Sequence, residues 1–127
     1  MKLNTLLRNA RAQQVINLIG PSPSVKCYSG AMPASTSDTA TGTLIAQLDL
    51  PSTWASTPSA GSFVQVGTWS TTSIAGGAVG YVRFCSADGT CWIQSDLVEG
   101  LFGSNGNTVD SGETVEISGF VWTESGA

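Results

Sequence analysis

Short runs of alternating apolar and polar residues, separated by glycine, proline, serine and threonine, make up most of the chain after residue 24. Between residues 43 and 50 the even-numbered positions are apolar, which predicts a half-buried strand that Pro51 ends. Similar runs predict strands at residues 25–28, 63–66, 69–74 and 114–123, with a further strand starting near Val109. We expect about seven or eight short strands in an all-β fold, an antiparallel β-sandwich of jelly-roll or immunoglobulin-like type.

The strongest local pattern lies between residues 78 and 98, where two runs rich in β-branched and aromatic residues flank Asp88-Gly89. This pattern is typical of a β-hairpin. We predict a three-residue loop, residues 87–89, with Gly89 in the left-handed conformation of a bulge. The expected cross-strand pairs are Ser86–Thr90, Cys85–Cys91, Phe84–Trp92 and Arg83–Ile93.

Residues 4–19 have the periodicity of a helix, which Asn4 or Thr5 can cap and which Gly20 and Pro21 would end. Its apolar residues form one stripe that continues to the end of the helix: Leu3, Leu6, Leu7, Ala10, Val15, Leu18 and Ile19. We therefore divide the chain into an N-terminal helical arm with a Pro/Ser connector, residues 1–24, and a β-sandwich domain, residues 25–127. The arm could pack on its own sheet or on a neighbouring subunit, and the sequence leaves both open.

Charge is sparse and unevenly placed. Charged residues are only 11% of the chain, four of the five cations lie within residues 1–26, and all nine acids follow them. This gives a basic arm on an acidic body that would repel phosphates, so we expect no nucleic-acid partner. No segment is long and apolar enough to predict a membrane span. Asn4, Arg8, Asn9 and Arg11 interrupt an otherwise signal-like start, and we expect an unprocessed protein made in the cytoplasm.

Catalytic and metal-binding patterns are weak. The chain contains no histidine, which removes the commonest general base and the commonest metal ligand. Asp96 with Glu99, or Glu113 with Glu116, would be the only carboxylate pairs to consider for glycoside hydrolysis, and each sits where acids are normally solvated. A loop with Asn105, Asn107, Asp110 and Glu113 could hold calcium, but turn-forming residues explain it without a metal. We expect no enzyme activity and no cofactor.

The three cysteines do not match a zinc site, which needs four ligands in paired short spacings. An odd number also argues against a secreted disulfide framework. Burial as small apolar groups is the simplest interpretation. If the hairpin register is correct, Cys85 and Cys91 could form a bridge across the strands under oxidising conditions.

Four tryptophans stand in different contexts. Trp69, Trp92 and Trp122 lie in predicted strands and are expected in the core or an interface. Trp54 lies in a loop rich in serine, threonine and proline, so we expect it to be exposed. An exposed tryptophan can anchor a protein interface or stack on a sugar, and we favour the interface.

Several stretches, taken in order, resemble a known family: Asn4–Ala10, Tyr28-Ser29-Gly30 with Pro33-Ala34, Thr41–Ala46, Gly80–Phe84 and Asp88-Gly89-Thr90. The chain resembles small β-rich proteins encoded among the head and tail genes of tailed bacteriophages. Cys85, Cys91 and Trp92 depart from the usual pattern, where valine- or threonine-like residues are expected. The resemblance implies a virion component more than it implies a mechanism.

Together these observations predict a structural protein of a tailed-phage particle, most simply a capsid decoration protein that binds the major capsid protein lattice. A tail, neck or tail-tip component is one alternative, and a glycan- or receptor-binding module that uses Trp54 is another. We expect a homo-oligomer, a trimer or a dimer. The residues predicted to contact the lattice or a second copy are Leu3, Leu6, Leu7, Arg8, Arg11, Ile19 and Trp54.

Overall fold

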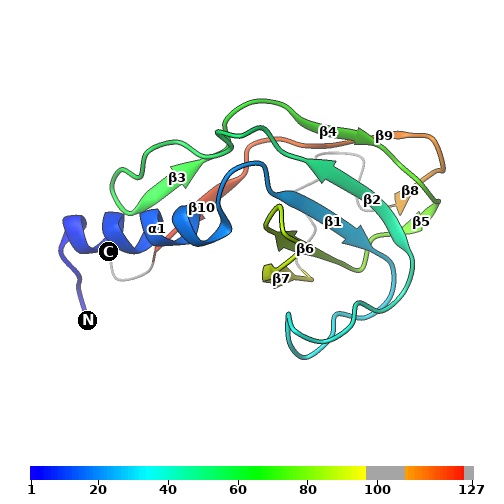
Figure 1. Cartoon of the computed structure of the whole chain (residues 1–127), viewed down its shortest axis with the longest axis horizontal. Coiled ribbons are helices and arrows are strands. Elements are labelled where there is room, and N and C mark those ends of the chain that lie inside the picture. The colour runs from blue at the N-terminus through cyan, green and yellow to red at the C-terminus, as the bar shows by residue number, and fades with distance from the viewer. Residues whose placement is uncertain (97–107, 125–127) are drawn as a thin grey trace.

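The computed structural model describes residues 1–96 and 108–124, which form one N-terminal helix and a set of small antiparallel sheets (Figure 1). The helix is α1 (Thr5–Ile19). In chain order the strands are β1 (Ser24–Tyr28), β2 (Leu44–Asp49), β3 (Ser62–Val64), β4 (Trp69–Thr72), β5 (Gly77–Ala78), β6 (Tyr81–Cys85), β7 (Cys91–Ser95), β8 (Thr108–Val109), β9 (Thr114–Ile117) and β10 (Val121–Thr123). The prediction of a mostly β, antiparallel fold with an N-terminal helix is confirmed.

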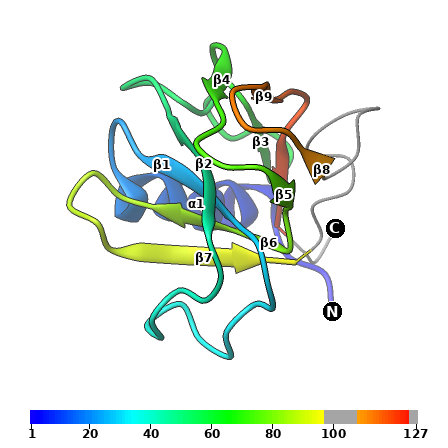
Figure 2. The ribbon, with the colours of Figure 1, turned by 90° about the vertical axis from the view of Figure 1, so that its right-hand side faces the viewer.

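Within the described residues, the largest sheet has four strands in the order β2-β1-β6-β7, and three two-stranded ribbons pair β3 with β10, β4 with β9, and β5 with β8. The sheets are small and open, and the second view shows the ribbons on one side of the four-stranded sheet (Figure 2). Each ribbon joins strands that are far apart in the sequence, so the C-terminal strands hold the middle of the chain in place.

Strand β6 is buried along its whole length, which is unusual in a sheet with one wet face. The loop of residues 30–43 covers its outer face. The Tyr81 hydroxyl donates to the Thr41 carbonyl at 2.8 Å, and the Arg83 guanidinium donates to the Ser35 carbonyl at 3.3 Å. This long polar loop is therefore a folded cover over the sheet.

Helix α1 has the predicted limits because its capping groups are local. The Asn4 side-chain oxygen accepts a hydrogen bond from the Leu6 N–H at 2.8 Å, and Gly20 ends the helix at φ +77°. The buried stripe, however, differs from the expected one. It consists of Arg8, Ala12 and Ile19, so Leu6 is left 77% exposed.

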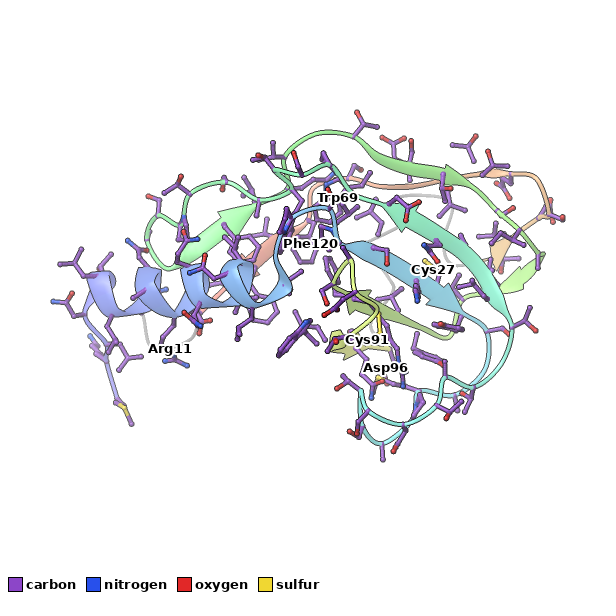
Figure 3. The ribbon with its side chains drawn as sticks, in the orientation of Figure 1. Arg11, Cys27, Trp69, Cys91, Asp96 and Phe120 are labelled. Atoms are coloured by element: carbon purple, nitrogen blue, oxygen red, sulfur yellow. A yellow bond between two sulfur atoms is a disulfide. The ribbon has the colours of Figure 1, made fainter. Side chains whose placement is uncertain are left out.

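The core is an aromatic cluster between the four-stranded sheet and the ribbons. Trp69 and Phe120, labelled in Figure 3, lie 5.3 Å apart between ring centroids, and each also packs against Phe84. Trp54 lies against the same cluster, 6.0 Å from Phe84. Aromatic rings of this size supply much of the apolar area that a small domain needs to bury.

The hairpin between β6 and β7 is confirmed, with Gly89 at φ +92° and the Ser86 N–H bonded to the Thr90 carbonyl at 2.8 Å. Hydrogen bonds from Ser86 and Thr90 hold the pKa of the Asp88 carboxyl below its usual range. Cys85 pairs with Cys91 as expected. Beyond that pair the register shifts, so the observed pairs are Phe84–Ile93 and Arg83–Gln94, and the expected Phe84–Trp92 and Arg83–Ile93 pairs are wrong.

Candidate protein-interaction surface

An apolar groove of about 240 Å³ lies between α1, β7 and β10. These elements come from the start, the middle and the end of the described chain. The groove is lined by Val15, Leu18, Ile19, Trp92, Ile93 and Trp122. Every lining residue has an apolar side chain, which favours a protein partner over a polar small molecule.

Trp92 is on this surface because of the shift in the hairpin. Between the Cys85–Cys91 and Phe84–Ile93 pairs, Trp92 is an extra residue of β7 that has no counterpart in β6. An extra residue in one strand turns the following side chains to the opposite face. The Trp92 ring is 42% exposed, and its indole N–H donates to the Ser86 hydroxyl at 3.3 Å.

The helix side of the groove continues along the outer surface of α1. Leu18 is 50% exposed and Leu7 is 49% exposed. With 100° per residue, these two positions differ by only about 20° around the helix and therefore share one stripe. Arg11 lies between them on the side of the helix that faces away from β3 (Figure 3), and its guanidinium pairs with Glu124 at 3.3 Å.

A second exposed apolar surface lies on the other face of the β3–β10 ribbon. Val64 and Val121 are directly paired across the two strands and are 46% and 54% exposed. Their neighbours Phe63 and Trp122 point to the opposite face, as strand geometry requires, and their rings stack 6.2 Å apart. The ribbon therefore separates two apolar surfaces, one on each face.

The expectation of an exposed Trp54 is wrong. Its side chain is 2% exposed, and its indole N–H donates to the Gly20 carbonyl at 2.9 Å. The ring lies edge-on to Phe63 and fills the space beneath the helix end. A cleft of about 350 Å³ lies beside it, between the end of α1 and residues 52–55. Trp54 is a core residue that fixes the helix end, and it offers no face for a sugar.

The other residues predicted to make contacts fall into two groups. Leu6, Leu7 and Arg11 are exposed, and Leu3 is partly exposed. Arg8 and Ile19 are buried inside their own chain, with 8% and 2% of their surfaces exposed, so the expectation that they project outward as contact residues is wrong, although Ile19 still lines the groove. The Arg8 guanidinium donates to the Glu124 carbonyl at 3.1 Å, so it ties α1 to the end of β10.

Of the candidate carboxylates that the structure describes, Glu116 is an exposed residue of β9, Asp96 is exposed after β7, and Glu113 acts in a turn. Glu113 accepts a hydrogen bond from the Asp110 N–H at 2.8 Å, which closes the turn before β9. Glu99, Asn105 and Asn107 lie outside the described residues. Within residues 1–96 and 108–124, no group of three or more acidic or cysteine side chains could hold a metal ion.

Two of the three cysteines form a disulfide and the third is a free thiol. Cys85 and Cys91 form a disulfide across the hairpin, which is the bridge that the register allowed. Cys27 is free and fully buried, and burial raises the pKa of its thiol to about 12. The disulfide fixes the residue next to Trp92, so it also fixes one wall of the groove.

Comparison with protein-family models, with curated proteins and with solved structures gives no match. Among the described residues, no helix has the length and apolar character needed to cross a membrane.

Proposed function

We propose that this chain is a structural component of a tailed-phage virion, a capsid decoration protein that binds the major capsid protein lattice and stabilises the head. It would be made in the host cytoplasm and would act by contact, without a reaction of its own. The observation that carries the proposal is the pair of exposed apolar surfaces on the two faces of the β3–β10 ribbon. A subunit that contacts more than one neighbour needs surfaces of this kind.

The scaffold suits this role because it holds the two surfaces rigidly. The aromatic cluster packs beneath the ribbon, and the Cys85–Cys91 disulfide fixes the hairpin that carries Trp92. A lattice presents many identical sites, so weak individual contacts of a repeated subunit can still give firm attachment. Preorganised surfaces lose little conformational entropy on binding, which favours such attachment.

The same packing supports a proposal for the finer architecture. We infer that the four-stranded sheet forms one layer of a β-sandwich and that the β4–β9 and β3–β10 ribbons form the other. The support is the position of Trp69 on β4 and of Phe84 on β6, whose rings pack edge to face across the core with their centroids 6.0 Å apart. Sandwiches of this kind recur in proteins that work through their surfaces.

The test is binding of the purified chain to tailed-phage heads that lack decoration proteins, measured by co-sedimentation. We propose that the exposed surface formed by Val64 and Val121 on the β3–β10 ribbon binds the capsid. We expect Val121→Asp to reduce binding at least tenfold, because a buried unpaired carboxylate is costly. Ser70→Asp, on an exposed strand position elsewhere, is the matched control and should bind as the wild type does. Binding to isolated tails but not to heads would instead favour the tail or neck alternative.

The glycan-binding alternative has lost the residue on which it depended, since Trp54 is buried. It is tested in the same samples with immobilised glycans. Saturable glycan binding by a chain that attaches to neither heads nor tails would overturn the structural role.

A further inference from the structure

We propose that the chain forms a two-fold symmetric dimer in which the α1 helices of two copies pack antiparallel, and Leu7 of each copy enters the apolar groove of the other beside Leu18 and Trp92. The inference rests on the proposed function only in assigning exposed apolar surface to assembly. It names the partner of the groove as a second copy of this chain.

The first support is self-complementarity. Leu7 and Leu18 lie on one stripe of α1, and each is about half exposed. In an antiparallel pair of helices centred between residues 12 and 13, residue 7 of one copy lies opposite residue 18 of the other, and the reverse holds at the other end. Such an arrangement is isologous, which is the commonest symmetry of soluble oligomers.

The groove cannot be filled by the leucine of its own helix. Eleven residues separate Leu7 from Leu18, which corresponds to about 16 Å along a rigid helix. The two exposed leucines of one copy therefore stay apart, and only another molecule can bring a Leu7 side chain to the groove.

The second support is the charge of the helix ends. The first turn of α1 contains no acid and the last turn contains no base, so no side chain on those turns compensates the helix dipole. Lys2 precedes the helix instead, where its charge opposes the dipole. An antiparallel partner would bring Lys2 close to the negative end of the other helix and would pair the two dipoles favourably.

The centre of the stripe is compatible with close packing. Arg11 lies between Leu7 and Leu18 on this exposed stripe, whereas Arg8 lies on the buried face of α1, and Arg11 already has a carboxylate partner in Glu124, at 3.3 Å. Two Arg11 side chains that meet near the symmetry axis would each carry this carboxylate with them. The dimer would then have apolar contacts at both ends and a neutral charged network at its centre.

The sharpest experiment is disulfide trapping in the full chain. In the variant with Leu7→Cys and Leu18→Cys, oxidation should give a covalent dimer with two intermolecular bridges, detected by intact mass and by non-reducing electrophoresis. A bridge within one copy is excluded, because Cα atoms joined by a disulfide lie within about 7 Å. The matched control is Leu6→Cys with Asn17→Cys, which has the same spacing on an adjacent stripe and should remain monomeric.

Sedimentation equilibrium of the unmodified chain gives an independent measurement. We expect a dimer, and we expect Leu18→Asp to raise its dissociation constant at least about a hundredfold while leaving the circular dichroism spectrum unchanged. A wild-type monomer, a trimer, or equal trapping of both cysteine pairs would overturn the inference.

The outcome is separable from that of the proposed function. A monomer that binds heads and loses this binding on Leu18→Asp would mean that the groove receives a capsid segment, which overturns the dimer alone. A dimer that binds no part of a virion would support the inference and overturn the proposed function.

Discussion

Gly42 and Gly112 have nearly the same backbone conformation, with φ of +77° and +81°, but very different surroundings. A Cβ atom on Gly42 would collide with the Ser29 carbonyl oxygen, whereas a Cβ on Gly112 would meet open space. We expect Gly112→Ala to lower the free energy of unfolding by about 1 kcal/mol, from left-handed strain alone. Gly42→Ala should lower it by about 3 kcal/mol or more, because the clash adds to the strain. Urea denaturation measures both, and equal losses would contradict the assigned contact.

The buried thiol of Cys27 predicts a loss of stability in alkaline solution. Its pKa rises from 9.0 to about 12 on folding, so the unfolded chain releases this proton at lower pH than the folded chain does. The stabilising contribution is complete below pH 9 and is lost as the pH rises toward 12. Tyr28, whose pKa burial also raises, contributes in the same direction.

The measurement is the free energy of unfolding as a function of pH for the wild type and for Cys27→Ala. The variant should show a smaller slope above pH 9, with the remaining slope due in part to Tyr28. Identical slopes would mean that the Cys27 thiol does not titrate differently in the folded and unfolded states.

The burial of Trp54 and the exposure of Trp92 both differ from what their local sequence suggests. The loop around Trp54 is polar, which predicts a wet side chain, but the carbonyl of Gly20 satisfies its indole N–H inside the fold. Trp92 lies in a strand whose alternation suggests burial. Trp92 is itself the extra residue of that strand, so Ile93 instead of Trp92 lies opposite Phe84. Local composition indicates neither the burial of Trp54 nor the exposure of Trp92, because both depend on partners far away in the sequence or across the hairpin.

Among the elements, those with local signals were predicted best. The Asn4 cap and Gly20 define α1, and Asp88-Gly89 defines the hairpin loop. The buried face of the helix was not predicted, because Arg8 is drawn inward by the Glu124 carbonyl at the other end of the chain. Because Arg8 turns that face inward, Leu6 and Leu7 are left exposed, and their predicted role as contact residues stays a prediction.

The hairpin element predicts a measurable response to reductant. Closing a loop as short as the one between Cys85 and Cys91 restricts the unfolded chain, which corresponds to about 2 kcal/mol of stability. We expect reduction to lower the free energy of unfolding by about that amount, and the Cys85→Ala, Cys91→Ala double variant to become insensitive to reductant. Cys27→Ala should keep the full response, since Cys27 forms no disulfide. A response that survives in the double variant would contradict this account.

The pairing of strands in the ribbons depends on packing across the whole molecule and could not be predicted from the sequence. The strand alternation locates β3, β4, β9 and β10, but nothing in it specifies that β10 returns to β3 or that β9 returns to β4. Those pairings are selected by the shared aromatic core, where Phe120 packs against Trp69 and Phe84. The two apolar surfaces result from the pairing of β10 with β3, because this ribbon places Trp122 on one face and Val121 on the other.

The proposed dimer couples assembly to the stability of the whole chain. If the folded copies associate and the unfolded chains do not, mass action makes the melting temperature rise with protein concentration. We expect this rise for the wild type, measured by calorimetry over a wide concentration range, and we expect it to vanish for Leu7→Asp. Leu6→Asp is the matched control: it adds the same charge to the same turn of α1 but lies off the contact stripe, so the concentration dependence should persist. A melting temperature that is independent of concentration for the wild type would show that the exposed stripe of α1 has no second copy as its partner.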